Sequence, residues 1–268
     1  MTRTQKQPKG WLVGKQLIDD LLAKSTAQLS AQDYEGAVRT CKRILRYLPK
    51  KDMVRAEALG MMGMAYAVQK KFEDSYQILS EAVEIAPEDS YLLFNRALSA
   101  RFTSRTGQSL RDFERVALMD KDTIISGRIK DEIKIAEKVA YSEMAMRGKD
   151  FTLDQLIEQQ ELFQQGNNLS GQGKWKQAEA AFRKSIGMGD CLPQPWGNLG
   201  ICLVMLNRFI EAEDAYRRAL KINPKYKRAK ENLESLDYWR KHPDEKPEYI
   251  ITSPFQDVKT NIMFYQEG

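Results

Sequence analysis

The sequence predicts an all-α protein built from repeated helix pairs, and three observations support this prediction. A short pattern of residues recurs along the chain in constant phase. Apolar residues recur three and four positions apart, which is the spacing of one face of a helix. Glycine and proline are sparse, at 16 and 9 among 268 residues, and several of them stand where helical stretches end.

The composition excludes several classes of protein. Hydrophobic residues make up 42% and charged residues 29%, as in a soluble folded chain. The net charge of +5 is too small to indicate nucleic-acid binding by itself. Three cysteines without a CxxC pair predict free thiols rather than a disulfide framework. With no apolar run of signal-peptide or membrane length, we expect a cytoplasmic protein that does not enter a membrane.

The recurring pattern is clearest in four stretches. In each, a polar residue precedes an aromatic residue, and a small residue stands three positions after the aromatic. The stretches are DYEGAV from Asp33, KFEDSY from Lys71, KWKQAE from Lys174 and RFIEAE from Arg208. Ala178 and Ala212, the last two small residues, are 34 positions apart, and counting 34 on from Ser75 reaches Ser109 in a fifth unit.

Other positions follow the same count. Four residues after the small residue stands a large one, at Leu79, Phe113, Phe182 and Tyr216. Glycine follows an apolar residue at Gly63 and Gly200, where a side chain would separate two paired helices. Proline ends the units at Pro49, Pro87 and Pro224 because it cannot continue a helix. The resulting units are 18–51, 56–89, 90–123, 159–192 and 193–226.

This pattern resembles the tetratricopeptide repeat family. The unit 193–226 has nearly the whole family signature, in Trp196, Leu199, Gly200, Ala212, Tyr216, Ala219 and Pro224. The resemblance implies a right-handed α-solenoid of helix-turn-helix repeats, in which neighbouring units stack to bury their apolar faces. It also implies a concave groove lined by the first helix of each pair.

The predicted organisation has six parts. They are an N-terminal extension (1–17), a first half of the array (18–123), an atypical long helix or degenerate repeat (124–158), a second half (159–226), a capping helix (227–241) and an extended C-terminal tail (242–268). In the atypical segment we expect one long helix that Gly148 stops, followed by a helix that Thr152 caps. The segment is either a decayed repeat or a hinge between the two halves.

The sequence offers little for catalysis. His242 is the only histidine and stands in the tail, so the repeats supply no histidine base. Cysteine and histidine are too few for a zinc site, and no glycine-rich phosphate loop is present. We therefore expect no enzyme activity, no metal and no cofactor.

The resemblance places a partner-binding groove on the first helices. It maps to Met64, Tyr91, Phe94, Leu98, Arg101, Phe102, Phe163, Asn167, Asn198, Ile201, Val204 and Met205, some of which we expect in the core between repeats. Such an apolar, methionine-containing set favours a protein or peptide ligand. In one subfamily the groove captures a C-terminal carboxylate. Here Asn167, Asn198 and Arg228 match that pattern but Phe163 and Asn232 replace two cations, so carboxylate capture should be weak.

A basic cluster follows the second half of the array. It comprises Arg217, Arg218, Lys221, Lys225, Lys227, Arg228 and Lys230. Three interpretations remain open: a solvated end of the array, a docking patch for an acidic partner, and, least favoured, a nucleic-acid surface.

The predicted function is that of a protein–protein interaction adaptor or assembly factor that binds a protein segment in the groove. One alternative is a self-associating scaffold whose own tail fills the groove. The tail has the apolar residues for this in Ile250, Ile251, Phe255, Val258, Ile262, Met263 and Phe264. A distant alternative is an RNA-binding helical repeat. A homo-oligomer is compatible with the first two.

Overall fold

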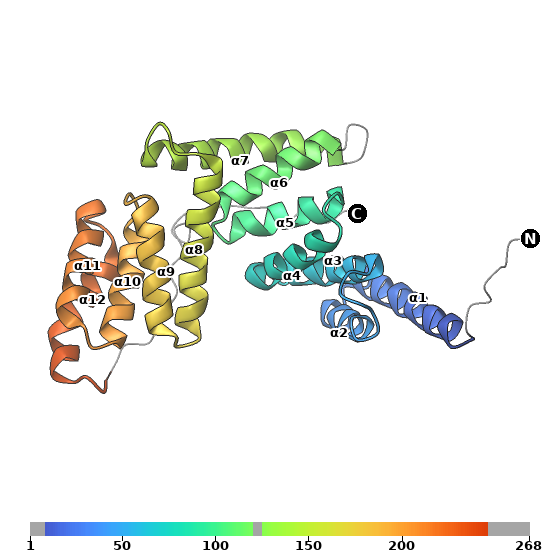
Figure 1. Cartoon of the computed structure of the whole chain (residues 1–268), viewed down its shortest axis with the longest axis horizontal. Coiled ribbons are helices and arrows are strands. Elements are labelled where there is room, and N and C mark those ends of the chain that lie inside the picture. The colour runs from blue at the N-terminus through green and yellow to red at the C-terminus, as the bar shows by residue number, and fades with distance from the viewer. Residues whose placement is uncertain (1–8, 120–124, 246–268) are drawn as a thin grey trace, which may run out of the picture. The chain divides into compact units, whose positions relative to one another are not determined.

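The computed structural model describes residues 9–119 and 125–245, and every regular element within these ranges is an α-helix (Figure 1). The predicted all-α repeat fold is confirmed. The chain separates into two compact units, residues 1–137 and 138–268. Residues 1–8 of the predicted extension and 246–268 of the predicted tail lie outside the described residues.

The first unit contains three helix pairs and the start of a long helix. Its helices are α1 (Lys9–Ser30), α2 (Tyr34–Ile44), α3 (Met53–Val68), α4 (Phe72–Ile85), α5 (Ser90–Phe102), α6 (Thr106–Met119) and the first part of α7 (Ile125–Arg147). Each helix of a pair packs on its partner, and α2 and α4 also pack on the first helix of the next pair. Neighbouring pairs thereby bury one another's apolar faces, as stacked repeats require.

The second unit contains the rest of α7, two helix pairs and a final helix. These are α8 (Leu153–Gly171), α9 (Trp175–Met188), α10 (Pro193–Met205), α11 (Phe209–Ile222) and α12 (Lys227–Lys241). The final helix α12 packs on α11 and buries only Ala229 and Leu236, so one face stays polar and solvated.

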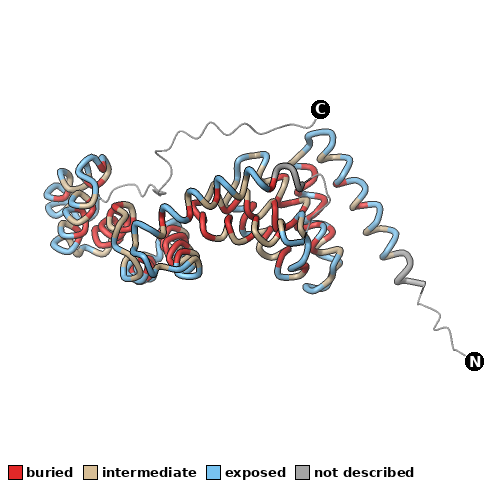
Figure 2. The backbone as a smooth tube through the Cα atoms, turned by 90° about the horizontal axis from the view of Figure 1, so that it is seen from above, coloured by how far each residue is buried: buried red, intermediate tan, exposed pale blue. Residues whose placement is uncertain are grey.

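The core of both units is built on a glycine that faces a large residue of the paired helix. A Cβ atom added to Gly63, Gly166 or Gly200 would lie 2.4–2.5 Å from a side-chain atom of the facing residue. The facing residues are Leu79, Phe182 and Tyr216, all fully buried. The small residues Ala37, Ser75, Ala178 and Ala212 are also fully buried. Buried stretches recur from helix to helix along the backbone (Figure 2).

The turns inside the five helix pairs share one backbone closure. One residue in each turn has a left-handed conformation, with φ between 60° and 71°; these residues are Gln32, Lys70, Ser104, Gly173 and Asn207. The N–H of the next residue donates to the carbonyl five positions earlier, over 2.8–2.9 Å. The N–H of the left-handed residue itself donates to the carbonyl three positions earlier. This pair of bonds is the Schellman motif, which satisfies carbonyl groups at the end of a helix.

The atypical segment includes the long helix α7 and the start of α8. Ile129, Ala136 and Ala140 are buried on one face. The helix ends before Gly148, whose φ of +131° favours glycine. Thr152 then caps α8 in a reciprocal capping box with Gln155. The boundary between the two compact units, after residue 137, falls within α7.

Candidate functional site

A groove of about 500 Å³ opens in the first unit, mainly between the first helices of its three pairs. We call it the first-unit groove. It is lined by Thr26, Leu29, Met53, Ala56, Glu57, Gly60, Met61, Met64, Ala86, Asp89, Tyr91 and Leu92. Helices α1, α3 and α5 supply most of these residues, and Ala86 and Asp89 stand between α4 and α5. Pockets of this size suit a few side chains of a ligand.

Helix α3 supplies the largest share of the lining. Met53, Glu57, Gly60, Met61 and Met64 stand at three- and four-residue spacing, so they share one face of the helix. Gly60 allows α3 to approach α5, because a Cβ there would lie 2.6 Å from Cδ2 of Leu92. The groove therefore has a close-packed floor, with methionines beside it.

The three methionines give the groove an adaptable apolar surface. Met53 is 63% exposed, and Met61 and Met64 are half-buried. The Ser25 hydroxyl donates to the sulfur of Met61 over 3.0 Å, and the Tyr91 hydroxyl donates to that of Met64. An unbranched thioether side chain has several rotamers and adjusts to different apolar shapes. The lining can thus accept varied apolar side chains.

The charges in the first-unit groove are of one sign. Glu57 and Asp89 are exposed, and they are the charged members of its lining. The Oδ1 atom of Asp89 accepts a hydrogen bond of 3.0 Å from the backbone N–H of Leu92, so Asp89 caps α5. Glu57 forms no ion pair with any residue that the structure describes. An apolar surface with acidic edges is the result.

The groove residues predicted from the sequence are distributed between this surface and the core. Met64 and Tyr91 line the first-unit groove. Leu98 in the first unit and Met205 in the second are half-buried. Arg101 is engaged in an ion pair with Glu132 of α7, and the ring of Phe102 stacks on Phe72 with centroids 4.2 Å apart.

Four predicted groove residues lie in core positions, which the sequence analysis expected for part of the set. Phe94 packs edge-on against Phe113, with ring centroids 5.6 Å apart, and is only 8% exposed. Phe163 packs on Phe182 in a tilted arrangement, with ring centroids 5.8 Å apart. Ile201 and Val204 are buried on α10. The physical reason is common to all four. The helices packed around them cover the side chains that the resemblance assigned to the groove.

The two asparagines also lie in the interior. The side-chain amide of Asn198 donates to Oδ1 of Asn167 over 2.9 Å, and Asn167 donates to Gln164 over 3.1 Å. Both asparagines are at most 2% exposed. Because they satisfy one another, they act here as a buried polar contact between α8 and α10.

The basic cluster is largely neutralised by neighbouring acids. Arg217 pairs with Glu213, and Arg218 pairs with Asp190. Lys227 and Lys230 pair with acids one turn further along α12. The remaining three, Lys221, Lys225 and Arg228, have no ion pair with another described residue. These contacts favour a solvated end of the array, since exposed pairs of this kind contribute little to binding or stability.

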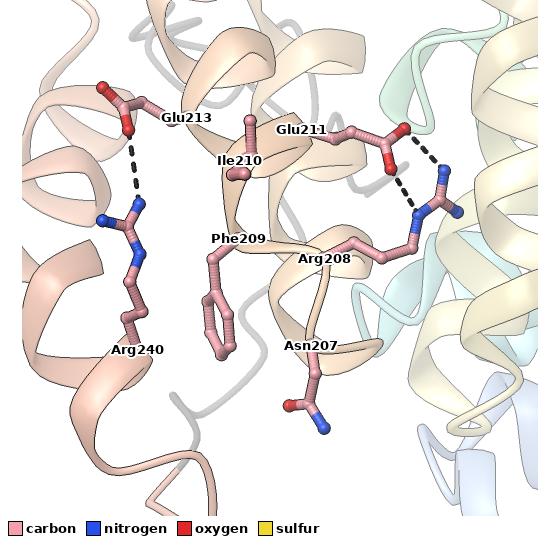
Figure 3. Close-up of a pocket in the computed structure, with 7 residues that line it drawn as sticks. All are labelled: Asn207, Arg208, Phe209, Ile210, Glu211, Glu213 and Arg240. Carbon is pink, nitrogen blue, oxygen red and sulfur yellow. Dashed lines mark hydrogen bonds and ion pairs between the residues drawn. The ribbon is translucent and has the colours of Figure 1, made fainter.

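A second cavity, of about 620 Å³, lies where the α10–α11 turn meets the end of α12 (Figure 3). It is lined by Asn207, Arg208, Phe209, Ile210, Glu211, Glu213 and Arg240. Its arginines already have partners, since Arg208 pairs with Glu211 and Arg240 with Glu213 (Figure 3). Hydrogen bonding from Arg208 lowers the pKa of the Glu211 carboxyl, which keeps this pair charged. This cavity therefore offers no unpaired charge to a ligand.

Sequence reasoning missed most of the α3 surface. Met53, Glu57 and Met61 were not predicted as groove residues, although they stand four positions apart. That four-residue spacing, followed by Met64 three residues after Met61, was the available signal.

Among the residues that the structure describes, no three His, Cys, Asp and Glu side chains cluster as metal ligands would. None of the described helices is long and apolar enough to cross a membrane.

Comparison with known proteins supports the repeat assignment. Models of the tetratricopeptide repeat match residues 193–226 and 56–89, which are two of the five units defined by the sequence. A human relative, the protein O-mannosyl-transferase TMTC1, is 24% identical over 196 residues. That match includes 71% of this chain but only 22% of the relative, so the chain spans about a fifth of its length.

Two solved structures are similar in arrangement. One is the TPR2AB-domain:pHSP90-complex of yeast Sti1, with 16% identity, a TM-score of 0.39, and coverage of 85% of this chain and 86% of that chain. The other is the P58(IPK) TPR domain, with 11% identity, a TM-score of 0.44, and coverage of 85% and 66%. The two family matches, and the helix pairs that contain them, show that this chain contains tetratricopeptide repeats.

Proposed function

We propose that this protein is an interaction adaptor that binds a segment of a partner protein in the first-unit groove. The observation that supports the proposal is the groove itself: a concave surface between stacked first helices, with three methionines exposed or half-exposed along it. Exposed apolar surface that is concave and adaptable is typical of sites for peptide segments. The family serves many processes, so the partner has to be sought from this surface.

The second unit has a different role in this proposal. Several of its polar groups already have partners within the unit, in the Asn167–Asn198 contact and in the ion pairs of α11 and α12. It therefore supports the array rather than supplying the main binding surface. Three free cysteines suit a reducing compartment, and we place the adaptor in the cytoplasm.

The test is to remove the apolar character of the groove without adding charge. Glutamine is close to methionine in length, so Met53→Gln combined with Met64→Gln changes polarity and little else. Short peptides displayed on phage are selected against the full chain and then assayed against this double variant. Peptides that depend on the groove should lose at least tenfold in affinity, because each buried apolar side chain contributes about 1.5–3 kcal/mol.

A matched control separates the groove from general effects on stability. Met119 and Met146 are also exposed, at 42% and 54%, and they lie outside the groove. Met119→Gln with Met146→Gln should leave affinity unchanged. Equal binding by both double variants would exclude the first-unit groove as the site.

The alternative, a scaffold whose own tail fills the groove, is tested with the same protein. Deleting residues 246–268 should then raise the affinity for selected peptides, because an internal competitor is removed. Unchanged affinity after the deletion would argue against this alternative.

A further inference from the structure

We infer that the first-unit groove selects apolar segments that carry a lysine or arginine. This inference rests on the proposed function and specifies the chemistry of its ligand. The starting observation is that Glu57 stands in the middle of the methionine face of α3, four residues after Met53 and four before Met61. A charged group in that place is adjacent to apolar surface on both sides.

The two acids of the groove are not equivalent. Asp89 caps α5, where its carboxylate already accepts a backbone hydrogen bond and faces the positive end of the helix dipole. Its charge is therefore partly compensated. Glu57 lies on a different helix, α3, where its side chain is exposed and forms no ion pair with a described residue. Glu57 is thus the acid best able to select for charge.

A lysine or arginine fits this arrangement by both parts of its side chain. Its aliphatic stem can cover the methionines while its charged group reaches the carboxylate. An acidic segment would instead meet like charge from Glu57 and Asp89 with no basic residue in the lining to offset it. Like-charge contact of this kind disfavours the wrong partner more strongly than the matched pair favours the right one.

The selection is local rather than a property of the whole molecule. The chain has a net charge of +5, which at long range repels a basic ligand. Screening at physiological salt limits that repulsion to about 8 Å, whereas the contact with Glu57 is direct. The basic residue is therefore recognised by direct contact with Glu57 and not by the net charge of the chain.

The experiment begins with peptides selected from a random phage-displayed library against the full chain. The probe is the tightest selected peptide whose binding is lost in the Met53→Gln, Met64→Gln variant, labelled for fluorescence anisotropy. We expect this probe to contain a lysine or arginine. Replacing that residue by glutamine should weaken binding about two- to fivefold, the range of a solvent-exposed charge pair.

A double-mutant cycle then identifies the partner of that charge. Glu57→Gln should weaken binding of the parent probe by the same factor, and should have no further effect on the probe that lacks the basic residue. Glu84 provides the matched control, because it is an exposed acid on α4 outside the groove. Glu84→Gln should bind the parent probe like the unmodified protein. Glu57→Lys should restore binding to a probe whose basic residue is replaced by glutamate.

The outcomes distinguish this inference from the proposed function. Groove-dependent probes that lack basic residues, or that bind Glu57→Gln normally, would overturn the charge selection and leave the adaptor function standing. A library that yields no groove-dependent probe would overturn both. A synthetic peptide of residues 249–268 is tested in parallel, and if it alone binds the groove, the occupant is the chain's own segment and the inference fails.

Discussion

Gly200→Ala should destabilise the second unit, although alanine is normally the better residue in a helix. An added Cβ would lie 2.4 Å from Cε1 of Tyr216 and 2.7 Å from its Cδ1. The tyrosine ring is fully buried in the core of the second unit, so it has no space to withdraw into. Overpacking of this kind costs about 1–3 kcal/mol. The gain in helix propensity returns about 0.5–1 kcal/mol, which leaves a net loss of about 1 kcal/mol at the middle of these ranges and up to about 2.5 kcal/mol.

The assay is unfolding in urea, with tryptophan fluorescence as the signal that monitors it. Three of the four tryptophans, Trp175, Trp196 and Trp239, belong to the second unit, so the signal reports mainly on the unit that contains Gly200. Gly187 is the matched control, since it lies in α9 with no atom within 4 Å of an added Cβ. Gly187→Ala should leave stability unchanged or slightly raise it.

A second variant tests the physical cause. Tyr216→Leu removes the ring that the new methyl group would strike, so the loss caused by Gly200→Ala should become smaller in that background. If Gly200→Ala instead unfolds at the same or a higher urea concentration than the parent, the close approach inferred at this position is wrong.

Three further predictions concern other parts of the structure. Asp112→Ala should destabilise the first unit by about 3 kcal/mol in urea unfolding, because Arg96 loses a buried bidentate partner at 2.6 and 2.7 Å; a loss under about 1 kcal/mol would contradict this. Lys221→Glu with Lys225→Glu should leave the affinity of groove-binding peptides unchanged at low salt, and a large loss would instead indicate that the basic cluster docks ligands. A thiol reagent should react first with half-buried Cys191 in the native protein. The other two thiols should react after unfolding, because burial raises their pKa to about 11, and fast reaction of all three would contradict the packing.

The repeat framework could be predicted because its signals are local in the sequence. Glycine and the large residue that faces it are 16 positions apart in Gly63–Leu79 and in Gly200–Tyr216, and the phase then locates every helix pair. The stop at Gly148 and the cap at Thr152 are equally local. Such signals are contained within one helix pair or one helix boundary, so they do not depend on how the two units are arranged.

The division between groove and core could not be predicted in this way. Phe94 and Tyr91 are three residues apart on α5, yet Phe94 is buried and Tyr91 is 48% exposed. Helical spacing places both on neighbouring faces, and only the packing of the adjacent helices decides which is covered. Met53 and Met61 on α3 were missed for the complementary reason: an apolar stripe is more often core, and here it borders a cavity.

The common closure of the turns has a practical consequence for measurement. Lys70 and Asn207 occupy the same left-handed position in α3–α4 and α10–α11, and both are exposed. Because the backbone there is the same whichever polar side chain it bears, single cysteines at these two positions would accept fluorophores without disturbing either helix pair. In a variant that also carries Cys191→Ser, the two fluorophores form a donor–acceptor pair for distance measurement. Energy transfer between the labels would follow the separation of the two compact units in solution, with and without a bound peptide.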